Sequence, residues 1–279
     1  IFTKRAGLQS PERYLMGLAT LISSVENQPG NRIQPVSESS FDAWIKQYRP
    51  NENSANSTIS YYSKGALVAL AMDLEIIHSS HGKFGLDEVM KAMYDEYYTK
   101  KGRGYTDAEF KAMIEKISGR SFDDIYAAYI NGVETIDYNK YLGYAGLELI
   151  DDSAGGNDSY LGAVTALKDG KIMIINVSRQ SPAWTGGLNV NDEILAIDNV
   201  RINNISDPRL AELEKFIANK HAGDKLNMLI NRDGLLYTKE ITLSGNPNHK
   251  FRISAIENAG SSQLVVRKRW LKIISAELT

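Results

Sequence analysis

Side chains that bind catalytic metals are scarce in this chain of 279 residues, which has four histidines and no cysteine. Hydrolytic zinc sites commonly use two histidines four residues apart on one helix, with a glutamate next to the first. The only close pair, His78 and His81, lacks both that spacing and that glutamate, and His221 and His249 stand in predicted loops. We interpret the pair as an exposed helix end, where imidazole is favourable. The sequence therefore predicts no metal site in this chain.

Other catalytic groupings are also missing from the sequence. There is no G-x-S-x-G nucleophile motif, and the lack of cysteine excludes thiolate chemistry and disulfides. The net charge is −2, from 32 basic and 34 acidic residues without a long basic block, so nucleic-acid binding has little support. No run of about 18 apolar residues is present, so we predict no membrane span. A content of 43% hydrophobic and 24% charged residues indicates a globular protein.

The first half of the chain has the residue spacing of helices. Residues 61–80 form the longest, with apolar side chains over most of the circumference, which is typical of a helix buried on several sides. A second helix is predicted at 107–118, where Thr106 and Glu109 form a capping box. We therefore expect an all-helical domain over residues 1–135.

Beyond about residue 133 the pattern changes to short apolar runs separated by turns. Asp-Gly pairs at 169–170 and 233–234 are strong hairpin signals, and one helix is predicted at 210–220. About five short strands with one or two helices predict a small, partly open barrel or sandwich. The last segment, 246–279, has too many apolar residues for a disordered tail, so we expect it to pack back onto the helices.

One motif in the second half is specific. Residues 181–198 read SPAWTGGLNVNDEILAID, which resembles the signature of PDZ domains in bacterial proteases. Pro182 is suited to begin a short helix, Gly187 permits the turn out of it, and the carboxylate of Asp192 can cap backbone N–H groups at that turn. The resemblance implies a PDZ domain over residues 141–245.

A PDZ domain binds an extended peptide as an added strand, between an edge strand and a helix. A loop of backbone N–H groups receives the terminal carboxylate or a backbone carbonyl. In the family this loop is an apolar-glycine-apolar segment before the edge strand. Two segments fit that description, 144–147 (YAGL) and 160–163 (YLGA).

We assign the loop to residues 144–147. Gly146 would let the backbone approach closely, and Leu147 and Leu149 would face the groove by two-residue alternation. The alternatives are that Gly146 is only a bulge in a core strand and that a segment of the same polypeptide fills the groove. The helix at 210–220 would supply the other wall through Leu213, with Phe216 or Ile217. The predicted peptide-binding residues are Tyr144, Ala145, Gly146, Leu147, Leu149 and Leu213.

The helical half carries a second resemblance. Segments 48–53 (YRPNEN) and 60–68 (SYYSKGALV), with 4–8 (KRAGL) and 269–271 (RWL), resemble the glycyl aminopeptidase family, which is metallopeptidase family sixty-one of the thermolysin-like gluzincin group. Its members have a β-rich N-terminal domain, a zinc catalytic domain and a C-terminal PDZ domain. The resemblance implies that residues 1–135 are the C-terminal part of the catalytic domain.

The family also implies a role for Tyr62. In related gluzincin aminopeptidases, a tyrosine followed by any residue and then lysine-glycine opens a buried helix, and its hydroxyl donates a hydrogen bond to the oxyanion that forms when zinc-bound water attacks the scissile carbonyl. Tyr62 occupies that position, and a phenol suits the task because it is neutral at pH 7 and donates one directed hydrogen bond. Without the resemblance, core packing is the simpler interpretation of Tyr62. Tyr61 is the alternative donor, and Lys64 is interpreted as a helix-entry residue.

Together these features predict an α+β multidomain protein: a helical domain, a small β-rich PDZ domain and a C-terminal extension over 246–279. We expect a C-terminal fragment of a zinc-dependent aminopeptidase-like hydrolase that begins at an internal residue, with the zinc ligands upstream. Such a fragment holds no cofactor and is inactive alone. Its expected partners are C-terminal or internal peptide segments and the upstream part of its own catalytic domain. The alternative is a non-catalytic PDZ adaptor. Because family members commonly carry a signal peptide, we favour an exported or periplasmic location.

Overall fold

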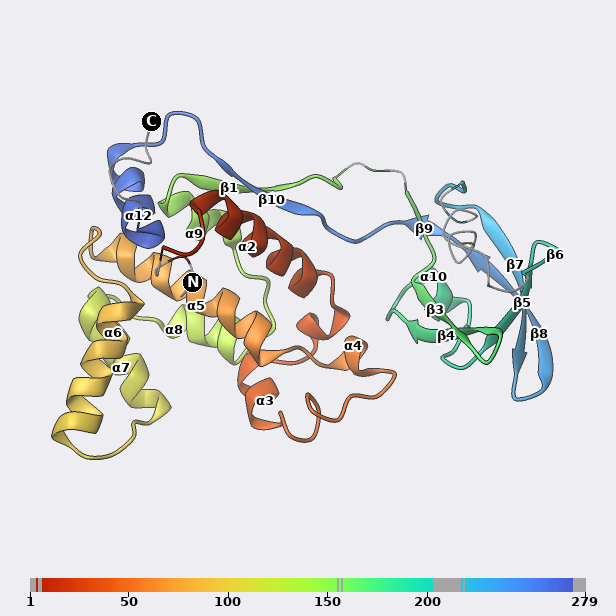
Figure 1. Ribbon diagram of the computed structural model, residues 1–279, viewed down its shortest axis with the longest axis horizontal. Coiled ribbons are helices and arrows are strands. Elements are labelled where there is room, and N and C mark those ends of the chain that lie inside the picture. Colours follow the sequence, from red (N-terminus) through yellow and green to blue (C-terminus); the bar gives the residue numbers. More distant parts are fainter. Residues whose placement is uncertain are drawn as a thin grey trace.

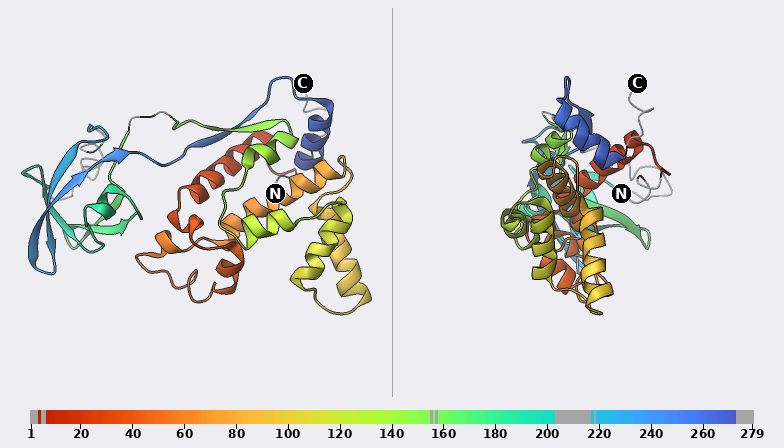
Figure 2. Two further views of the ribbon diagram at one scale, coloured as in Figure 1. Left: turned by 180° about the vertical axis from the view of Figure 1, so that it is seen from behind. Right: turned by 90° about the vertical axis from the view of Figure 1, so that its left-hand side faces the viewer.

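The computed structural model describes residues 4, 7–154, 156, 158–202, 217 and 219–272. It has a helical domain and a β-rich domain, which two extended segments of chain connect (Figure 1). The C-terminal helix packs on the helical domain, far from the β-rich domain (Figure 2). This arrangement confirms the α+β fold class predicted from the sequence.

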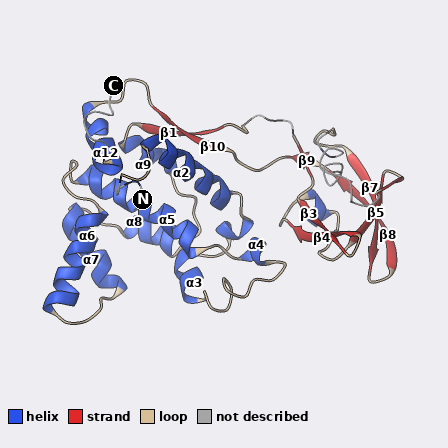
Figure 3. Ribbon diagram, viewed as in Figure 1, coloured by secondary structure: helices blue, strands red, loops and turns tan. Residues whose placement is uncertain are grey.

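The described chain up to residue 144 is mainly helical (Figure 3). Two segments, η2 and η3, are π-helices, and η1 is a short 3-10 helix. The elements are α2 (Pro11–Glu26), η1 (Pro29–Arg32), α3 (Val36–Phe41), α4 (Ser54–Ser57), α5 (Tyr61–Ser79), α6 (Leu86–Met93), η2 (Tyr94–Lys100), α7 (Asp107–Ser118), α8 (Asp123–Ile125), η3 (Tyr126–Ile130), α9 (Tyr138–Tyr144) and, near the C-terminus, α12 (Ser261–Leu271).

Helix α5 forms the centre of the helical domain. It contacts α2, α3, α6, α7, α9 and α12, and its Leu67 and Leu74 are fully buried. Two acidic residues on it are buried as well, and the carboxylate of Glu75 lies 2.8 Å from Arg120. The prediction of a long helix surrounded by neighbours is therefore confirmed. In the described part of the chain, no helix is both long and apolar enough to cross a membrane.

The β-rich domain contains an antiparallel sheet in the order β3-β4-β5-β7-β8. Both Asp-Gly pairs form the predicted hairpin turns, with positive φ at Asp169, Gly170, Asp233 and Gly234. The strands are β2 (Ser159–Tyr160), β3 (Ala163–Lys168), β4 (Lys171–Val177), β5 (Glu193–Ile197), β6 (Val200–Arg201), β7 (Lys225–Arg232), β8 (Leu235–Thr242) and β9 (Ser244–Gly245); β6 pairs with β5, and β2 with β9.

The segment 181–198 folds as its residue types indicate. The hydroxyl of Ser181 caps α10 (Pro182–Thr185) by accepting a hydrogen bond from Trp184 N at 3.2 Å. The buried carboxylate of Asp192 accepts a hydrogen bond from Asn189 N at 2.8 Å, which closes the turn that leads into β5. A capped short helix and a capped turn thus join β4 to β5.

The C-terminal segment returns to the helical domain, as predicted. Strand β10 (Phe251–Ala255) pairs antiparallel with β1 (Leu147–Asp151) and packs on α2. Helix α12 then contacts α5 and α9. Its Trp270 is fully buried and meets the ring of Tyr14 edge-on at 5.7 Å. The two ends of the described chain therefore share one hydrophobic core.

Strand β1 differs from the predicted domain boundary. The PDZ prediction began at residue 141, whereas β1 belongs to the helical domain through β10 and through Leu147, which is buried in the helical core. The β-rich sheets begin at Ser159. Of the described residues, 152–154, 156, 158 and 246–250 lie in the connection between the two domains.

Candidate functional site

Three tyrosine hydroxyls meet at the N-terminal end of α5. The Tyr48 hydroxyl lies 3.0 Å from that of Tyr61 and 3.2 Å from that of Tyr62, and the rings of Tyr61 and Tyr62 are 4.2 Å apart. Tyr62 is 63% exposed, so it does not pack in the core. The hydrogen bond with Tyr48 lowers the pKa of Tyr62 and raises that of Tyr61. Tyr62 is exposed whereas Tyr61 is half-buried, which favours Tyr62 over Tyr61 as a donor to a ligand.

Lys64 holds the same N-terminal end of α5 against η1. Its side chain is buried, and Nζ donates a hydrogen bond to Asn31 O at 3.0 Å. Burial lowers the pKa of Lys64 to about 8. A buried ammonium with a backbone partner holds the helix end against η1, which agrees with its interpretation as a helix-entry residue.

The described residues do not fit a metal ion. No group of three or more histidine, aspartate and glutamate side chains among them is arranged to hold one. His78 stacks on Tyr144 at 3.8 Å, and His249 Nδ1 lies 2.7 Å from Asp151 Oδ2. The zinc ion that the resemblance implies therefore has no site in the part of the chain that the structure describes.

The loop assigned to residues 144–147 lies in the wrong domain for peptide binding. Tyr144 ends α9 and donates a hydrogen bond to Glu75 on α5 at 3.1 Å; burial raises its pKa to about 12. Ala145 and Leu147 are buried in the helical core. Gly146 has φ +65°, and a side chain there would meet Ala259 on the approach to α12.

The edge strand proposed to follow this loop is β1, and both its pairing edge and its side chains are already engaged. Leu149 packs against the helical core, and β1 pairs along its length with β10. These contacts argue against peptide binding at residues 144–147; Gly146 directly precedes β1, and the pair of β1 and β10 shows no register shift. Leu213 and Phe216, predicted for the other wall, lie outside the described residues.

The second apolar-glycine-apolar segment, 160–163, comes directly before an edge strand, which is the position expected of a peptide-binding loop. It leads into β3, which among the described residues pairs only with β4 and so leaves one edge open. The N–H groups of Leu161 and Gly162 donate no hydrogen bond within the described part of the chain. Ile217 lines the same cleft, of about 1060 Å³, as residues 160–164. An open strand edge, two free N–H groups and an apolar wall can together hold an extended peptide.

Gly162 is required at this turn for two reasons. Its φ is +76°, and a Cβ atom would lie 2.1 Å from the Cβ of Ser181. We expect Gly162→Ala to destabilise the β-rich domain by about 1–3 kcal/mol, because a side chain is strained there. Gly170→Ala is the matched control, since φ is +77° but nothing lies within 4 Å. Chemical unfolding of both variants measures the difference; equal losses would contradict the contact with Ser181.

Comparisons with known proteins agree with these two regions. Residues 1–68 match the model of the M61 glycyl aminopeptidase family, and residues 159–243 match the model of the PDZ domain. The resemblance predicted from the sequence is confirmed. The M61 match includes Tyr48, Tyr61 and Tyr62, and the PDZ match includes the loop at Gly162. No curated protein sequence matches the chain.

Solved structures also resemble this chain. An aminopeptidase N family protein from Idiomarina loihiensis matches 94% of this chain, with a TM-score of 0.80 and 26% identity, and the match covers 45% of that protein's chain. This chain thus spans less than half the length of that relative. A serine endoprotease from Yersinia pestis matches 32% of this chain and 30% of its own (23% identity, TM-score 0.28). The HtrA-type protease AlgW with decapeptide matches 33% and 30% (22% identity, TM-score 0.28).

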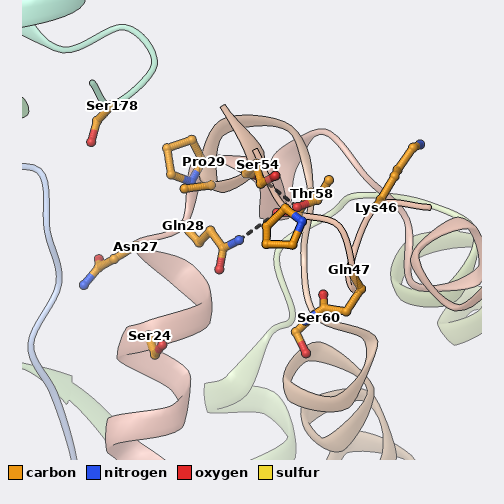
Figure 4. Close-up of a pocket in the computed structure, with 12 residues that line it drawn as sticks. Ser24, Asn27, Gln28, Pro29, Lys46, Gln47, Ser54, Thr58, Ser60 and Ser178 are labelled. Atoms are coloured by element: carbon orange, nitrogen blue, oxygen red, sulfur yellow. Dashed lines mark hydrogen bonds between the residues drawn. The ribbon is translucent and has the colours of Figure 1, made fainter. Parts of the chain in front are cut away.

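A cavity of about 420 Å³ lies between the helical domain and the PDZ domain (Figure 4). It is lined by Ser60, which caps α5 directly before the tyrosines, and on the PDZ side by Ser178. It shares residues 27–29 and Ser178 with the peptide cleft, so the two hollows adjoin. Nothing in the sequence signalled this junction, because its polar residues have no common motif.

Proposed function

We propose that this chain forms the C-terminal part of a zinc-dependent aminopeptidase-like peptide hydrolase, whose PDZ domain binds peptide segments. One observation carries the proposal: the M61 match and the PDZ match stand in the order of that family, and each contains an accessible group suited to peptide chemistry. These groups are the exposed Tyr62 side chain and the N–H groups of Leu161 and Gly162, which donate no hydrogen bond to any described residue. The structural match with the aminopeptidase N family protein spans both.

Tyr62 serves the reaction as a hydrogen-bond donor. Its hydroxyl points away from the core and donates to the substrate carbonyl oxygen as negative charge develops there. Tyr48 orients that hydroxyl through its own hydrogen bond of 3.2 Å. Since the described residues do not fit zinc, the metal ligands lie in a part of the enzyme outside them. We expect the chain alone to be inactive as a peptidase, and an exported or periplasmic location fits such an enzyme.

The PDZ domain binds its peptide as an added strand on β3. The loop at Leu161 and Gly162 receives the end of the peptide, or a carbonyl of an internal segment, through its free N–H groups. Apolar peptide side chains reach the wall that includes Ile217. This activity belongs to the chain as it stands and can be measured without the catalytic metal.

Peptide binding is tested by Ile217→Asp. We expect it to weaken binding of apolar-ended peptides by about tenfold or more, since burying a charge in the apolar wall is unfavourable. Val200→Asp, an exposed β6 position 57% accessible to solvent, is the matched control and should bind normally. Fluorescence anisotropy with the whole chain gives both affinities. If no peptide binds the unaltered chain, or if both variants bind equally well, the assigned groove is wrong.

A second candidate function is a non-catalytic adaptor, in which the PDZ domain only holds partners. It is favoured by the open groove together with the lack of a metal-binding group among the described residues. Peptidase activity separates the two functions. An active longer protein that loses turnover when Tyr62 is changed supports the enzyme, whereas a longer protein that binds peptides without cleaving them supports the adaptor.

A further inference from the structure

An apolar stripe on and directly after α3 faces the solvent instead of the core. Its side chains recur at positions i, i+3, i+4 and i+7, which is the spacing of one helical face. Such a face is normally buried, so its exposure as one connected patch indicates a binding surface. This outer stripe consists of Phe41 (89% exposed), Trp44 (80%), Ile45 (72%) and Tyr48 (50%).

The stripe is exposed because the opposite face of the same segment is held by the helical domain. Ser39 and Ala43, four residues apart, are buried, and the Ser39 hydroxyl donates a hydrogen bond to Ile59 O. The turns after α3 keep its helical course, since Lys46 N donates to Asp42 O at 2.9 Å and the two side chains form an ion pair at 2.8 Å. The apolar side chains are therefore displayed on a fixed support.

The outer stripe ends at the candidate catalytic tyrosine. The ring of Tyr48 lies 5.2 Å from that of Trp44, and the Tyr48 hydroxyl lies 3.2 Å from that of Tyr62. An extended peptide advances roughly 3.3–3.6 Å per residue, so the indole lies within about three residues of a carbonyl bound by Tyr62. Seven steps along a helix cover about 10 Å, which is again about three extended residues. The stripe thus matches a short extended segment that begins at Tyr62.

We propose that the outer stripe binds apolar side chains of the substrate after the scissile bond, and that Trp44 is the specificity-determining residue. The inference rests on the proposed aminopeptidase function and names its substrate class, which is peptides with an apolar residue among the first three after that bond. An aminopeptidase substrate has a single residue before the bond, so only the part after it can lie along several side chains. Aromatic rings suit this contact because each buries a large apolar area.

The test uses a longer protein that contains this chain and the rest of an aminopeptidase active site. Its substrates are hexapeptides with alanine at the N-terminus and glycine elsewhere, in which leucine or serine stands in turn at the second, third or fourth position. We expect leucine to raise kcat/KM about tenfold over serine at one or more of these positions, since burying an apolar side chain is favourable. The released alanine, measured by chromatography, gives the rates.

Variants of the stripe assign the preference to particular side chains. Trp44→Ala should bring the leucine and serine peptides to within about twofold of each other at the position that the indole contacts. Phe41→Ala, at the far end of the stripe, is the second variant and should act at a position farther from the cleaved bond. Trp184→Ala alters a partly exposed tryptophan on α10 and is the matched control, which should keep the preference.

The outcomes separate this inference from the proposed function. Equal rates for leucine and serine at all three positions overturn the inference and leave the peptidase activity intact. A parallel fall for both peptides in Trp44→Ala and Phe41→Ala also overturns it, because the stripe then packs against another part of the enzyme. If the unaltered longer protein cleaves no peptide, the proposed function itself is wrong.

Discussion

Tyr62→Phe is expected to lower kcat by about 100- to 1,000-fold in a longer protein that contains this chain and the rest of an aminopeptidase active site, the usual loss for one oxyanion donor. The change removes a single oxygen atom from an exposed ring, so the fold should be retained. KM should change little, because the hydrogen bond strengthens only as charge develops in the transition state. Steady-state rates with an aminoacyl-p-nitroanilide give both constants.

Two control variants test whether the effect is specific to Tyr62. Tyr61→Phe removes the neighbouring hydroxyl, which the same Tyr48 contacts at 3.0 Å, and should cost far less. Tyr98→Phe alters an equally exposed tyrosine on η2 and should have no effect. A Tyr62 variant that loses binding and turnover alike, or neither, would exclude the proposed role. A larger loss for Tyr61 would transfer that role to it.

Much of the helical domain could be predicted because its signals are local. The apolar residues around α5, the capping box at Thr106 and Glu109, and the Gly119 that ends α7 each act within a few residues. The Asp-Gly turns and the cap at Asp192 are equally local. The contact of the Tyr62 hydroxyl with Tyr48 was harder to predict, because Tyr48 lies fourteen residues earlier, outside the helix.

The choice between two glycine loops shows where local signals fail. Gly146 and Gly162 both have left-handed φ values, +65° and +76°, between apolar neighbours. The difference lies in partners distant in sequence: β1 pairs with β10, about a hundred residues later, whereas β3 keeps an open edge. A strand's pairing partner is a property of the whole fold. The pattern of residues therefore left two loops open, and the pairing of β1 with β10 argues against the one that we had assigned.

The contact of Asn56 with the PDZ domain could not be predicted from the sequence, for a similar reason. Asn56 stands in a stretch rich in asparagine and serine, which predicts a loop and no more. Its two hydrogen bonds cross more than a hundred residues to Val177 and Arg179. Both partners belong to the other domain, so its role depends on how the two domains meet. This polar junction lies between the two candidate sites, so it is the place where they can influence each other.

Arg232→Met is expected to destabilise the PDZ domain by about 3–5 kcal/mol, the usual cost of removing one partner from a buried ion pair. Asp192 is fully buried, and Arg232 contacts its two oxygens at 2.6 and 2.7 Å. Arg232 also donates to Gly187 O at 2.8 Å, so it joins the turn before β5 to β7. Methionine keeps much of the volume but leaves the carboxylate, among the described residues, with the hydrogen bond from Asn189 alone.

The matched control for this prediction lies on the same strand. Lys225 on β7 pairs with Glu240 at 2.7 Å, but the two side chains are 60% and 55% exposed. Lys225→Met should therefore cost less than about 1 kcal/mol, because water screens an exposed pair. Hydrogen exchange of the β7 amides reports the stability of this domain separately from the helical one. Similar small losses in both variants would contradict the stabilising role of this ion pair and would leave the hydrogen bond to the turn as the reason for an aspartate there.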